Sequence, residues 1–391
     1  MCGHRAQIHG SAKSTVYHIP YAGKPCLITL KKRRYRCPSC NKTFTENQPL
    51  ISRLTPHVSK CLETFVQDEL EHVRTIAELE RITGASKNII AKLEMGVQMP
   101  KRHLSHNLCI DEVRVFSKKI AIKRGDPHMS CCIYDADKKT LVDMLKGDGS
   151  KTVTEYMEGF TKGERDAVAT VSCDLRGSYI HLAEKLFPGA VIYADKFHVS
   201  KLVTGALDCV RKRLTHTIED DKAHTEQRKA MHRASKLILI RKDKLKQEKQ
   251  RTCVRSALEI DKADELKRAY LALQLFFEWS DTTYKNRDEM ELALKRWISI
   301  AKRTSVPEIR SVVKTINKRM PYILNAWEYR RTNAVAESLS RQIKDIIRNC
   351  RGFMSFATLR HRCLLVLGHK RESNKPIPLF TRSDKRKERA N

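Results

Sequence analysis

Two aspartates in the 391-residue chain stand where a carboxylate is expected to do chemistry. Asp111 interrupts the apolar segment LCIDEVRVF, and a buried charge is costly unless it emerges at a sheet edge or binds a cation. Asp174 ends the apolar segment AVATVSCD, directly before a predicted helix. Because ligands bind at strand ends in open α/β sheets, we expect both side chains to project toward such a site. Glu112, next to Asp111, points to the other sheet face by strand alternation.

A third acidic residue, Glu337, lies on a helix predicted over 333–350. At about 100° per residue its face also carries three basic side chains, Arg341, Lys344 and Arg348, while apolar residues occupy the opposite face. One stripe therefore packs and the other could contact a polyanion. Periodicity leaves a plainer alternative open, a solvated face with a Glu337–Arg341 ion pair worth only ~0.3–0.5 kcal/mol.

The charge of the chain favours a nucleic-acid partner. Lysine and arginine number 76 and aspartate and glutamate 45, a formal net charge of +31, whereas a net charge of ~2–8 is enough to keep a small domain soluble. No stretch approaches the ~20 apolar residues of a membrane span, and the first ten residues lack the apolar core of a signal peptide. We therefore expect a cytoplasmic protein with no membrane partner. Thirteen cysteines in such a chain are expected to stay thiols or to bind metal.

A cysteine pair near the N-terminus could hold half of a zinc site. Cys37 and Cys40 lie in the knuckle RYRCPSCNKTF, which can deliver two thiolates to tetrahedral Zn²⁺. The candidate partners are Cys2, His4 and Cys26, but a complete second cysteine pair is missing. The alternative is a metal-free hairpin with two exposed thiols.

Residues 75–93 have the pattern of a helix-turn-helix. A first helix, a glycine-containing turn and a second helix that begins after Ser86 are expected there. Lys87, Asn88 and Lys92 could then face the major groove of DNA. An ordinary helical hairpin would give the same pattern, but the charge of the chain favours DNA.

Alternating elements in the middle of the chain predict an α/β core. The expected strands are 108–115, 128–134, 140–145, 167–173 and 190–194, and the expected helices are 150–160 and 177–187. From residue 198 to about 330 strand signals disappear and long charged helices are expected. Further helices are expected over 333–350 and 354–367, followed by a basic, disordered tail.

The order of these motifs, with the segments FPGAVIYADKFHV and RTNAVAESLSRQIKDIIRNCRGFMSF, resembles the DDE transposases of bacterial insertion sequences, specifically the ISL-type family. The resemblance covers nearly the whole chain and is most specific over 171–199 and 333–353. It implies an α/β, ribonuclease-H-like catalytic core that is interrupted by an all-α insertion and preceded by a zinc ribbon and a helix-turn-helix. The implied domains are 1–55 (zinc-ribbon-like, with an incomplete first cysteine pair), 56–103 (helix-turn-helix), 104–199 (first part of the core), 200–330 (helical insertion), 331–369 (last helices of the core) and 370–391 (basic tail).

The resemblance also implies roles for single residues. Asp111, Asp174 and Glu337 match the family's acidic triad, which would hold two Mg²⁺ or Mn²⁺ ions. In this scheme Asp111 bridges the ions, Asp174 holds one and Glu337 the other. Asp195 and His198 match a D-x-x-H signature: Asp195 could compete with Asp174 as a ligand, and His198 could contact DNA, orient the site or be a core histidine.

The implied function is a transposase that binds the terminal inverted repeats of an insertion sequence, cleaves the DNA at its ends and transfers the 3′-hydroxyl to target DNA. Double-stranded DNA is the expected partner, a homo-oligomer is expected on DNA at the bacterial nucleoid, and the ribbon could bind Zn²⁺ through Cys37, Cys40 and Cys2. Ser338 and Ser340 stand where the family usually has a glycine and an asparagine. A non-catalytic DNA-binding regulator derived from an inactive transposase is therefore the alternative, and a nuclease acting on RNA–DNA hybrids is a second one.

Overall fold

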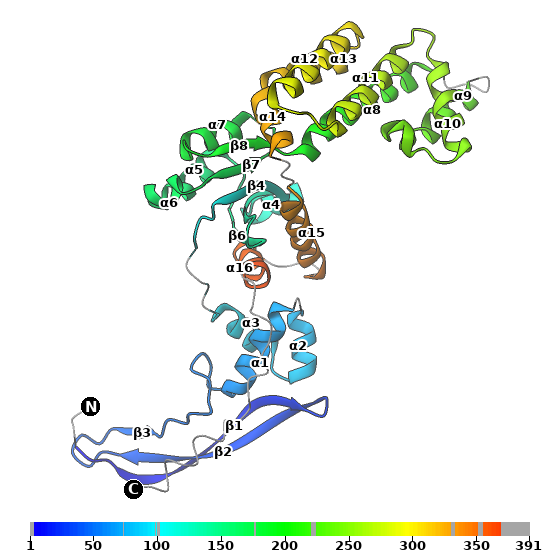
Figure 1. The fold of residues 1–391 in the computed structure, drawn as a ribbon. Coiled ribbons are helices and arrows are strands. Elements are labelled where there is room, and N and C mark those ends of the chain that lie inside the picture. The colour runs from blue at the N-terminus through cyan, green and yellow to red at the C-terminus, as the bar shows by residue number, and fades with distance from the viewer. Residues whose placement is uncertain are drawn as a thin grey trace.

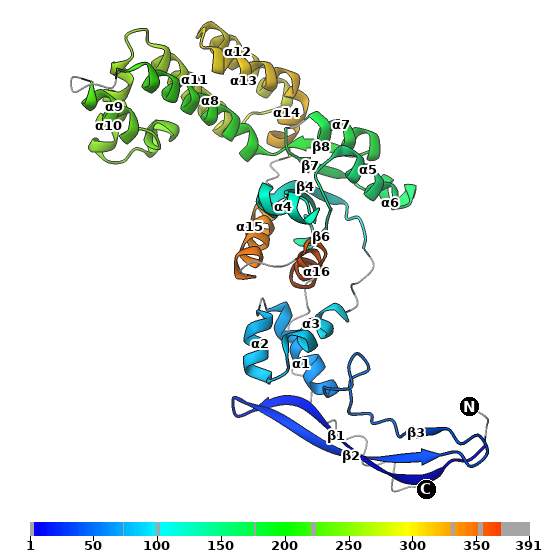
Figure 2. The same ribbon diagram turned by 180° about the vertical axis from the view of Figure 1, so that it is seen from behind.

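The computed structural model describes residues 4–72, 74–97, 99, 102–175, 177–219, 224–329, 333–350 and 355–368. The chain is drawn out along one direction, with a β-ribbon at one end, a mixed sheet in the middle and a helical arm at the other end (Figures 1 and 2). Cys2 and the expected tail over 370–391 lie outside the described residues.

The N-terminal part is a long antiparallel ribbon. Its strands are β1 (Gln7–Tyr21), β2 (Lys24–Arg36) and the short β3 (Thr43–Thr45), which pairs with β2. Ala22 and Gly23 connect β1 to β2 with φ values of 49° and 75°. Positive φ at both positions gives a two-residue turn whose twist matches that of the strands.

Three short helices follow the ribbon and share a small core. They are α1 (Lys60–Glu71), α2 (Ile76–Thr83) and α3 (Lys87–Met95). Thr75 begins α2 with a reciprocal capping box to Glu78, and Gly84 ends it with a left-handed φ of 73°. The core between the helices contains Leu62, Val66, Leu70, Leu79, Ile90 and Leu93. The two helices and the glycine-containing turn expected over 75–93 are confirmed.

A five-stranded mixed sheet forms the centre of the molecule. Its strands are β4 (Asn107–Arg114), β5 (Met129–Asp135), β6 (Thr140–Met144), β7 (Thr170–Cys173) and β8 (Val191–Ala194). They lie in the order β6-β5-β4-β7-β8. β4, β5 and β6 are antiparallel, and β7 and β8 run parallel to β4. The α/β core expected from the sequence is confirmed, with strand ends shifted by a few residues.

Helices cover both faces of this sheet. On one face α5 (Ser150–Glu158) and α7 (Gly177–Leu186) pack on apolar residues that include Cys131 and Ile133. On the other face α15 (Ala334–Asn349) and α16 (Phe356–Leu367) pack on Cys132 and Tyr134. Successive β5 residues thus serve opposite faces, as strand alternation requires. Two short helices, α4 (Lys118–Arg124) and α6 (Lys162–Asp166), complete this region.

The last helix, α16, joins the sheet to the three N-terminal helices through charged contacts. Arg360 donates two hydrogen bonds to Asp143 of β6, at 2.7 and 2.9 Å. The Arg362 side chain, two residues further on, donates to Glu94 of α3 and, at 2.8 Å, to the carbonyl of Arg74. Because Arg362 and Glu94 are both buried, this pair fixes the helical module against the sheet.

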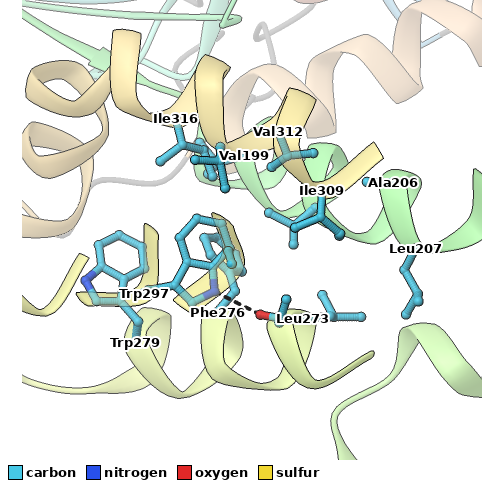
Figure 3. Packing of buried hydrophobic residues seen from close by; sticks show 14 of the residues in the cluster. Val199, Ala206, Leu207, Leu273, Phe276, Trp279, Trp297, Ile309, Val312 and Ile316 are labelled. Atoms are coloured by element: carbon cyan, nitrogen blue, oxygen red, sulfur yellow. Dashed lines mark hydrogen bonds between the residues drawn. The ribbon is translucent and has the colours of Figure 1, made fainter. Parts of the chain in front are cut away.

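The arm is helical throughout its described residues. It consists of α8 (Lys196–Thr217), α9 (Thr225–Arg233), η1 (Leu237–Leu239), η2 (Lys242–Lys244), α10 (Glu248–Ile260), α11 (Glu265–Asp281), α12 (Arg287–Arg303), α13 (Pro307–Lys318) and α14 (Met320–Glu328). Its core is built around aromatic rings (Figure 3): Phe276 packs on Trp279 and Trp297, and the Trp297 indole donates to the carbonyl of Ala272 at 2.9 Å. The expected run of helices is confirmed.

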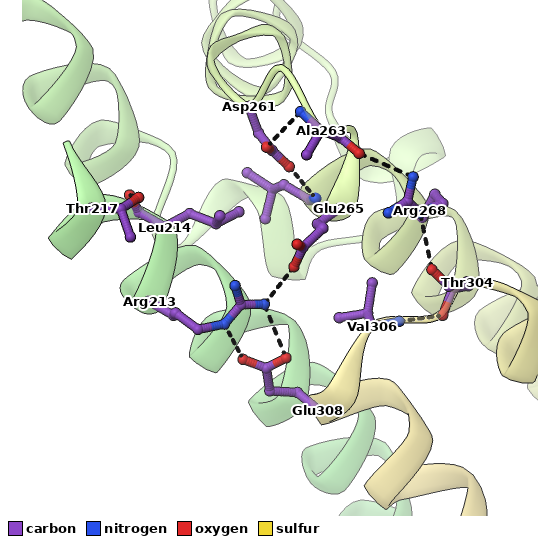
Figure 4. A network of polar contacts seen from close by, with 11 residues as sticks. Arg213, Leu214, Thr217, Asp261, Ala263, Glu265, Arg268, Thr304, Val306 and Glu308 are labelled. Carbon is purple, nitrogen blue, oxygen red and sulfur yellow. Dashed lines mark hydrogen bonds and ion pairs between the residues drawn. The ribbon is translucent and has the colours of Figure 1, made fainter.

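An arginine on α8 ties three helices of the arm together. The Arg213 guanidinium donates to Glu265 of α11 at 2.6 Å and to Glu308 of α13 at 2.8 Å (Figure 4). Because α8 follows β8 directly and leads from the sheet into the arm (Figure 1), this contact ties α11 and α13 to the helix that leaves the sheet. No helix in the described part of the chain is long and apolar enough to cross a membrane.

Candidate active site

Three aspartates lie side by side where β7 and β8 end. This row of Asp111, Asp174 and Asp195 is called the acidic edge. Asp111 is within β4, Asp174 follows β7 directly, and Asp195 follows β8 directly. Cys173, the last residue of β7, pairs with β4 on one side and with β8 on the other. Each aspartate is the next residue along its strand from this paired row, so parallel register brings all three to one level. Asp174 follows the end of its strand as expected, whereas Asp111 lies within β4, three residues before the strand ends.

His198 lies between two of these carboxylates. Its Nδ1 atom is 3.1 Å from Oδ2 of Asp195 and 3.6 Å from Oδ1 of Asp174. The contact with Asp195 raises the pKa of His198, the nearby Asp174 and Asp111 add to this effect, and burial opposes it. His198 therefore belongs to the acidic site rather than to the apolar core.

Asp111 is an unfavourable place for a negative charge. Its Oδ1 accepts from the backbone N–H of Glu112 at 2.8 Å. Burial raises the pKa of Asp111, and the neighbouring Asp195 and Asp174 raise it further, while this backbone hydrogen bond and His198 lower it. A cation placed here would offset both the desolvation and the repulsion.

The N-terminal half of α15 is hydrogen-bonded to the same aspartates. Asn333, which precedes the helix, donates from Nδ2 to Asp195 Oδ2 at 3.3 Å. Ser340 Oγ donates to Asp111 Oδ2 at 3.4 Å and lies 2.7 Å from the hydroxyl of Tyr134. Sequence reasoning had not assigned these contacts. The i, i+7 spacing of Asn333 and Ser340, which places both on one helix face, is a signal that could have found them.

Glu337 lies along α15 one turn after Asn333 and one turn before Ser340. Its side chain is exposed. In the described part of the chain, no three or more His, Cys, Asp and Glu side chains form a group that could hold a metal ion as it stands. The triad of Asp111, Asp174 and Glu337 thus stays a prediction. Its donor chemistry does fit Mg²⁺, which prefers carboxylate oxygens.

Asp195 and Glu112 differ from the predicted ligands in what they contact. Asp195 is 3% exposed, and its Oδ1 accepts from the backbone N–H of Phe197 at 3.0 Å, which caps α8. Its other oxygen faces Asn333 and His198. Glu112 points toward Tyr179 of α7, on the sheet face opposite Ser340, as strand alternation predicts.

The predicted DNA-contacting side chains are exposed. On α15 these are Arg341, Lys344 and Arg348, of which Arg348 forms a 3.0 Å ion pair with Asp345. On α3 they are Lys87, Asn88 and Lys92. Nζ of Lys87 also lies 3.6 Å from Glu80 of α2. Both sets could reach a phosphate backbone, which remains a prediction.

The zinc knuckle lies at the end of the ribbon away from its turn. Cys37 follows β2 directly, and its backbone N–H donates to the carbonyl of Lys42 at 2.9 Å, so Cys40 lies in a tight loop. His4 precedes β1 at the same end of the ribbon, because Gln7 pairs with the last residue of β2. Cys26 was wrong as a candidate partner: it lies near the turn, eleven residues along β2 from Cys37, or roughly 35 Å at ~3.3 Å per residue.

Comparison with known proteins agrees with this arrangement. A model of the DDE domain of ISL3 transposases, described as a transposase, matches residues 108–363, which is more than half of the chain. The chain belongs to the ISL3 transposase family. A model of the zinc finger of the IS204/IS1001/IS1096/IS1165 transposases matches residues 1–40, so the family's zinc ribbon is present as well. The comparison with curated proteins yields no match. The ISL-type resemblance inferred from the motifs is thereby confirmed.

Proposed function

We propose that this ISL3-family chain cleaves DNA at the ends of an insertion sequence and joins the freed 3′-hydroxyl to target DNA. The observation that carries the proposal is the meeting of Asp111 and Asp174 at adjacent strand positions, with α15 hydrogen-bonded to the same edge through Asn333 and Ser340. The helix that bears Glu337 is thereby held beside the two aspartates. The strand order, three antiparallel strands followed by two parallel ones, supports a ribonuclease-H-like core.

Asp111, Asp174 and Glu337 would hold two Mg²⁺ ions, or Mn²⁺. Bound there, the ions would neutralise charge on the phosphate, activate the attacking oxygen and stabilise the leaving one. The proposal gives Asp195 and His198 a different role. Because both oxygens of Asp195 already contact groups of the chain, it orients His198 and the first turn of α8 rather than competing with Asp174.

DNA would be held by basic surfaces both beside the acidic edge and away from it. α2 and α3 would act as a helix-turn-helix, with Lys87, Asn88 and Lys92 in the major groove of the terminal inverted repeats. Arg341 and Lys344 would contact phosphates near the cleaved bond, an attraction that weakens steeply as salt rises. Two ends must meet, so a homo-oligomer on DNA is part of the proposal.

The zinc ribbon would add to DNA binding. Cys37 and Cys40 would supply two thiolates to Zn²⁺, together with Cys2 outside the described residues. Loss of either thiolate in the knuckle should release the metal, which inductively coupled plasma mass spectrometry of the purified protein would detect.

The test is strand cleavage of a plasmid that carries the coding sequence with its flanking DNA. Wild-type protein with Mg²⁺ should nick at two mapped ends and join them to a second duplex, whereas Asp111→Asn, Asp174→Asn and Glu337→Gln should not. Glu112→Gln is the matched control, since Glu112 is the strand neighbour of Asp111 that faces the other side. All variants should still bind the ends in a gel-shift assay with EDTA.

Each other outcome points to a specific alternative. Specific binding of the ends without cleavage by the wild type would indicate a DNA-binding regulator descended from an inactive transposase. Cleavage of RNA–DNA hybrids without joining to a second duplex would indicate a nuclease. Equal cleavage by wild type and Asp111→Asn would rule out the acidic edge as the reactive centre.

A further inference from the structure

The first turn of α8 sends three consecutive side chains in different directions at the acidic edge. His198 faces Asp195 and Asp174. Lys196 places its Nζ 5.0 Å from the centre of the Trp327 ring, in the junction with the arm. Phe197, between them, is 54% exposed.

The position of Phe197 is fixed although its ring lies in solvent. Its backbone N–H donates to Asp195 at 3.0 Å, and its ring meets His198 edge-on, with the centroids 5.8 Å apart. Single exposed apolar side chains are ordinary on protein surfaces. Phe197 differs from Leu271 and Ile300, exposed on α11 and α12 of the arm, because it belongs to the turn that also holds Asp195 and His198.

We propose that Phe197 is a nucleobase-stacking site that holds the base next to the phosphate bound at the acidic edge. The proposal rests on the proposed function, since it takes that edge as the place of the reacting phosphate. The Phe197 ring centre lies 5.8 Å from that of His198, so the ring lies within reach of the nucleotide adjoining a phosphate held beside His198. Every base offers a π-face, so the stack needs no particular sequence.

The chemistry of the surroundings favours a nucleic-acid strand as the occupant. The chain carries a net charge of +31, which attracts phosphates. The base that stacks on Phe197 must leave its neighbours in the duplex, at a cost that an aromatic partner partly offsets. Phe197 therefore stabilises a DNA end in which one base beside the cleavage position is unstacked.

A binding experiment tests the stack without catalysis. Duplexes of the element's ends carry 2-aminopurine at one position at a time across the terminal nucleotides, and emission is measured with EDTA. Emission should rise at a single position when wild-type protein binds, because the base leaves its neighbours, and it should rise much less with Phe197→Ala. Phe197→Tyr keeps the ring and should behave as wild type, as should Ile300→Ala, the matched exposed apolar control. An equal rise with Phe197→Ala would overturn the proposal.

A cleavage experiment tests the same contact from the side of the DNA. With Mg²⁺, Phe197→Ala should slow cleavage about 5- to 150-fold, the range expected from one lost base–aromatic stack. An abasic site at the position found by fluorescence should slow the wild type by a similar factor, and the two losses should not multiply, as for any pair of directly interacting groups. If the losses from Phe197→Ala and from the abasic site multiplied, or if Phe197→Ala kept full activity, the stacking proposal would be wrong. The proposed function would still stand. Absence of cleavage by the wild type would instead contradict the proposed function, and the fluorescence result would still decide whether Phe197 stacks on a base.

Discussion

Two groups of carboxylates on the same sheet have their negative charge compensated in different ways. One is Asp143 alone, and the other is Asp111 with Asp195. Asp143 of β6 is 0% exposed and meets two arginines: Arg360 at 2.7 and 2.9 Å and Arg102 at 2.5 Å. Asp111 and Asp195 instead contact a hydroxyl, an amide, an imidazole and backbone N–H groups. Among their described hydrogen-bond and ion-pair partners there is no arginine or lysine. Asp143 is neutralised by the fold, whereas Asp111 retains a capacity for a cation.

This difference separates a carboxylate that stabilises the fold from one that serves a reaction. Removing one partner of a buried ion pair leaves an uncompensated charge, which is strongly destabilising. Removing a carboxylate whose pKa is raised by burial and by like charges relieves an unfavourable interaction. A substitution of Asp143 should therefore mainly lower stability, whereas a substitution of Asp111 should mainly lower activity.

The largest expected effect is the loss of activity in Asp111→Asn. Cleavage of the mapped ends should fall by more than about 100-fold, since loss of a residue that only hydrogen-bonds a metal ligand already costs about 10–100-fold. The melting temperature measured with EDTA should stay the same or rise, because the substitution removes a charge from a site that disfavours it. A marked drop in the melting temperature would contradict the assignment of Asp111 to the uncompensated group.

The second effect is a loss of stability in Asp143→Asn. Arg360 and Arg102 would then lose their counter-charge, and the free energy of unfolding should fall by about 1.5–3 kcal/mol, less than for a fully buried pair because both arginines are about one-third exposed. Urea unfolding measures this loss, with Asp166→Asn on exposed α6 as the control that should change little. A loss below about 1 kcal/mol would show that Asp143 is not needed to balance the two arginines.

A smaller effect is expected where α15 is attached to the aspartates. Ser340→Ala removes the hydroxyl between Tyr134 and Asp111 and should lower cleavage or apparent Mn²⁺ affinity about 10–100-fold. Ser340→Thr keeps the hydroxyl and should rescue most of the activity. Ser338→Ala, on the exposed side of the same helix, is the control. If Ser338→Ala and Ser340→Ala behaved alike, the attachment would have no role in catalysis.

Local patterns in the sequence predicted the elements of the site well. Asp111 within an apolar strand and Asp174 at the end of one could be placed because strand alternation and strand ends are encoded by neighbouring residues. The helical period of 3.6 residues likewise predicted that Lys344 lies on the exposed face of α15. These features depend on periods of two and 3.6 residues, which need no knowledge of the rest of the fold.

The contacts that distinguish the two groups depend on tertiary packing. Arg360 meets Asp143 across 217 residues, and Asn333 meets Asp195 across 138. Nothing next to Asp143 in the sequence separates its structural role from the reactive role expected of Asp111, because both interrupt apolar strands. The strand register of the ribbon likewise excludes Cys26 as a zinc ligand, because it places Cys26 near the turn and Cys37 at the other end. The sequence can predict that two strands pair, but it does not show their register.

A third group, in which Arg213 contacts Glu265 and Glu308 near the surface of the arm, extends the comparison because its expected effect on stability is small. Arg213 lowers the pKa of Glu308 from its usual value of 4.5, chiefly through their hydrogen bond. A lowered pKa in the folded state gives stability that is present above about pH 4.5 and is lost as the pH falls through the folded value. Arg213 is 39% exposed, so screening by water limits the effect to at most about 1 kcal/mol.

The difference in unfolding free energy between wild type and Arg213→Met, measured by urea unfolding from pH 7 to pH 3, should therefore be small at pH 7 and should shrink further below pH 4.5. A difference that stayed constant across this range would show that Arg213 stabilises the arm by packing rather than by its charge.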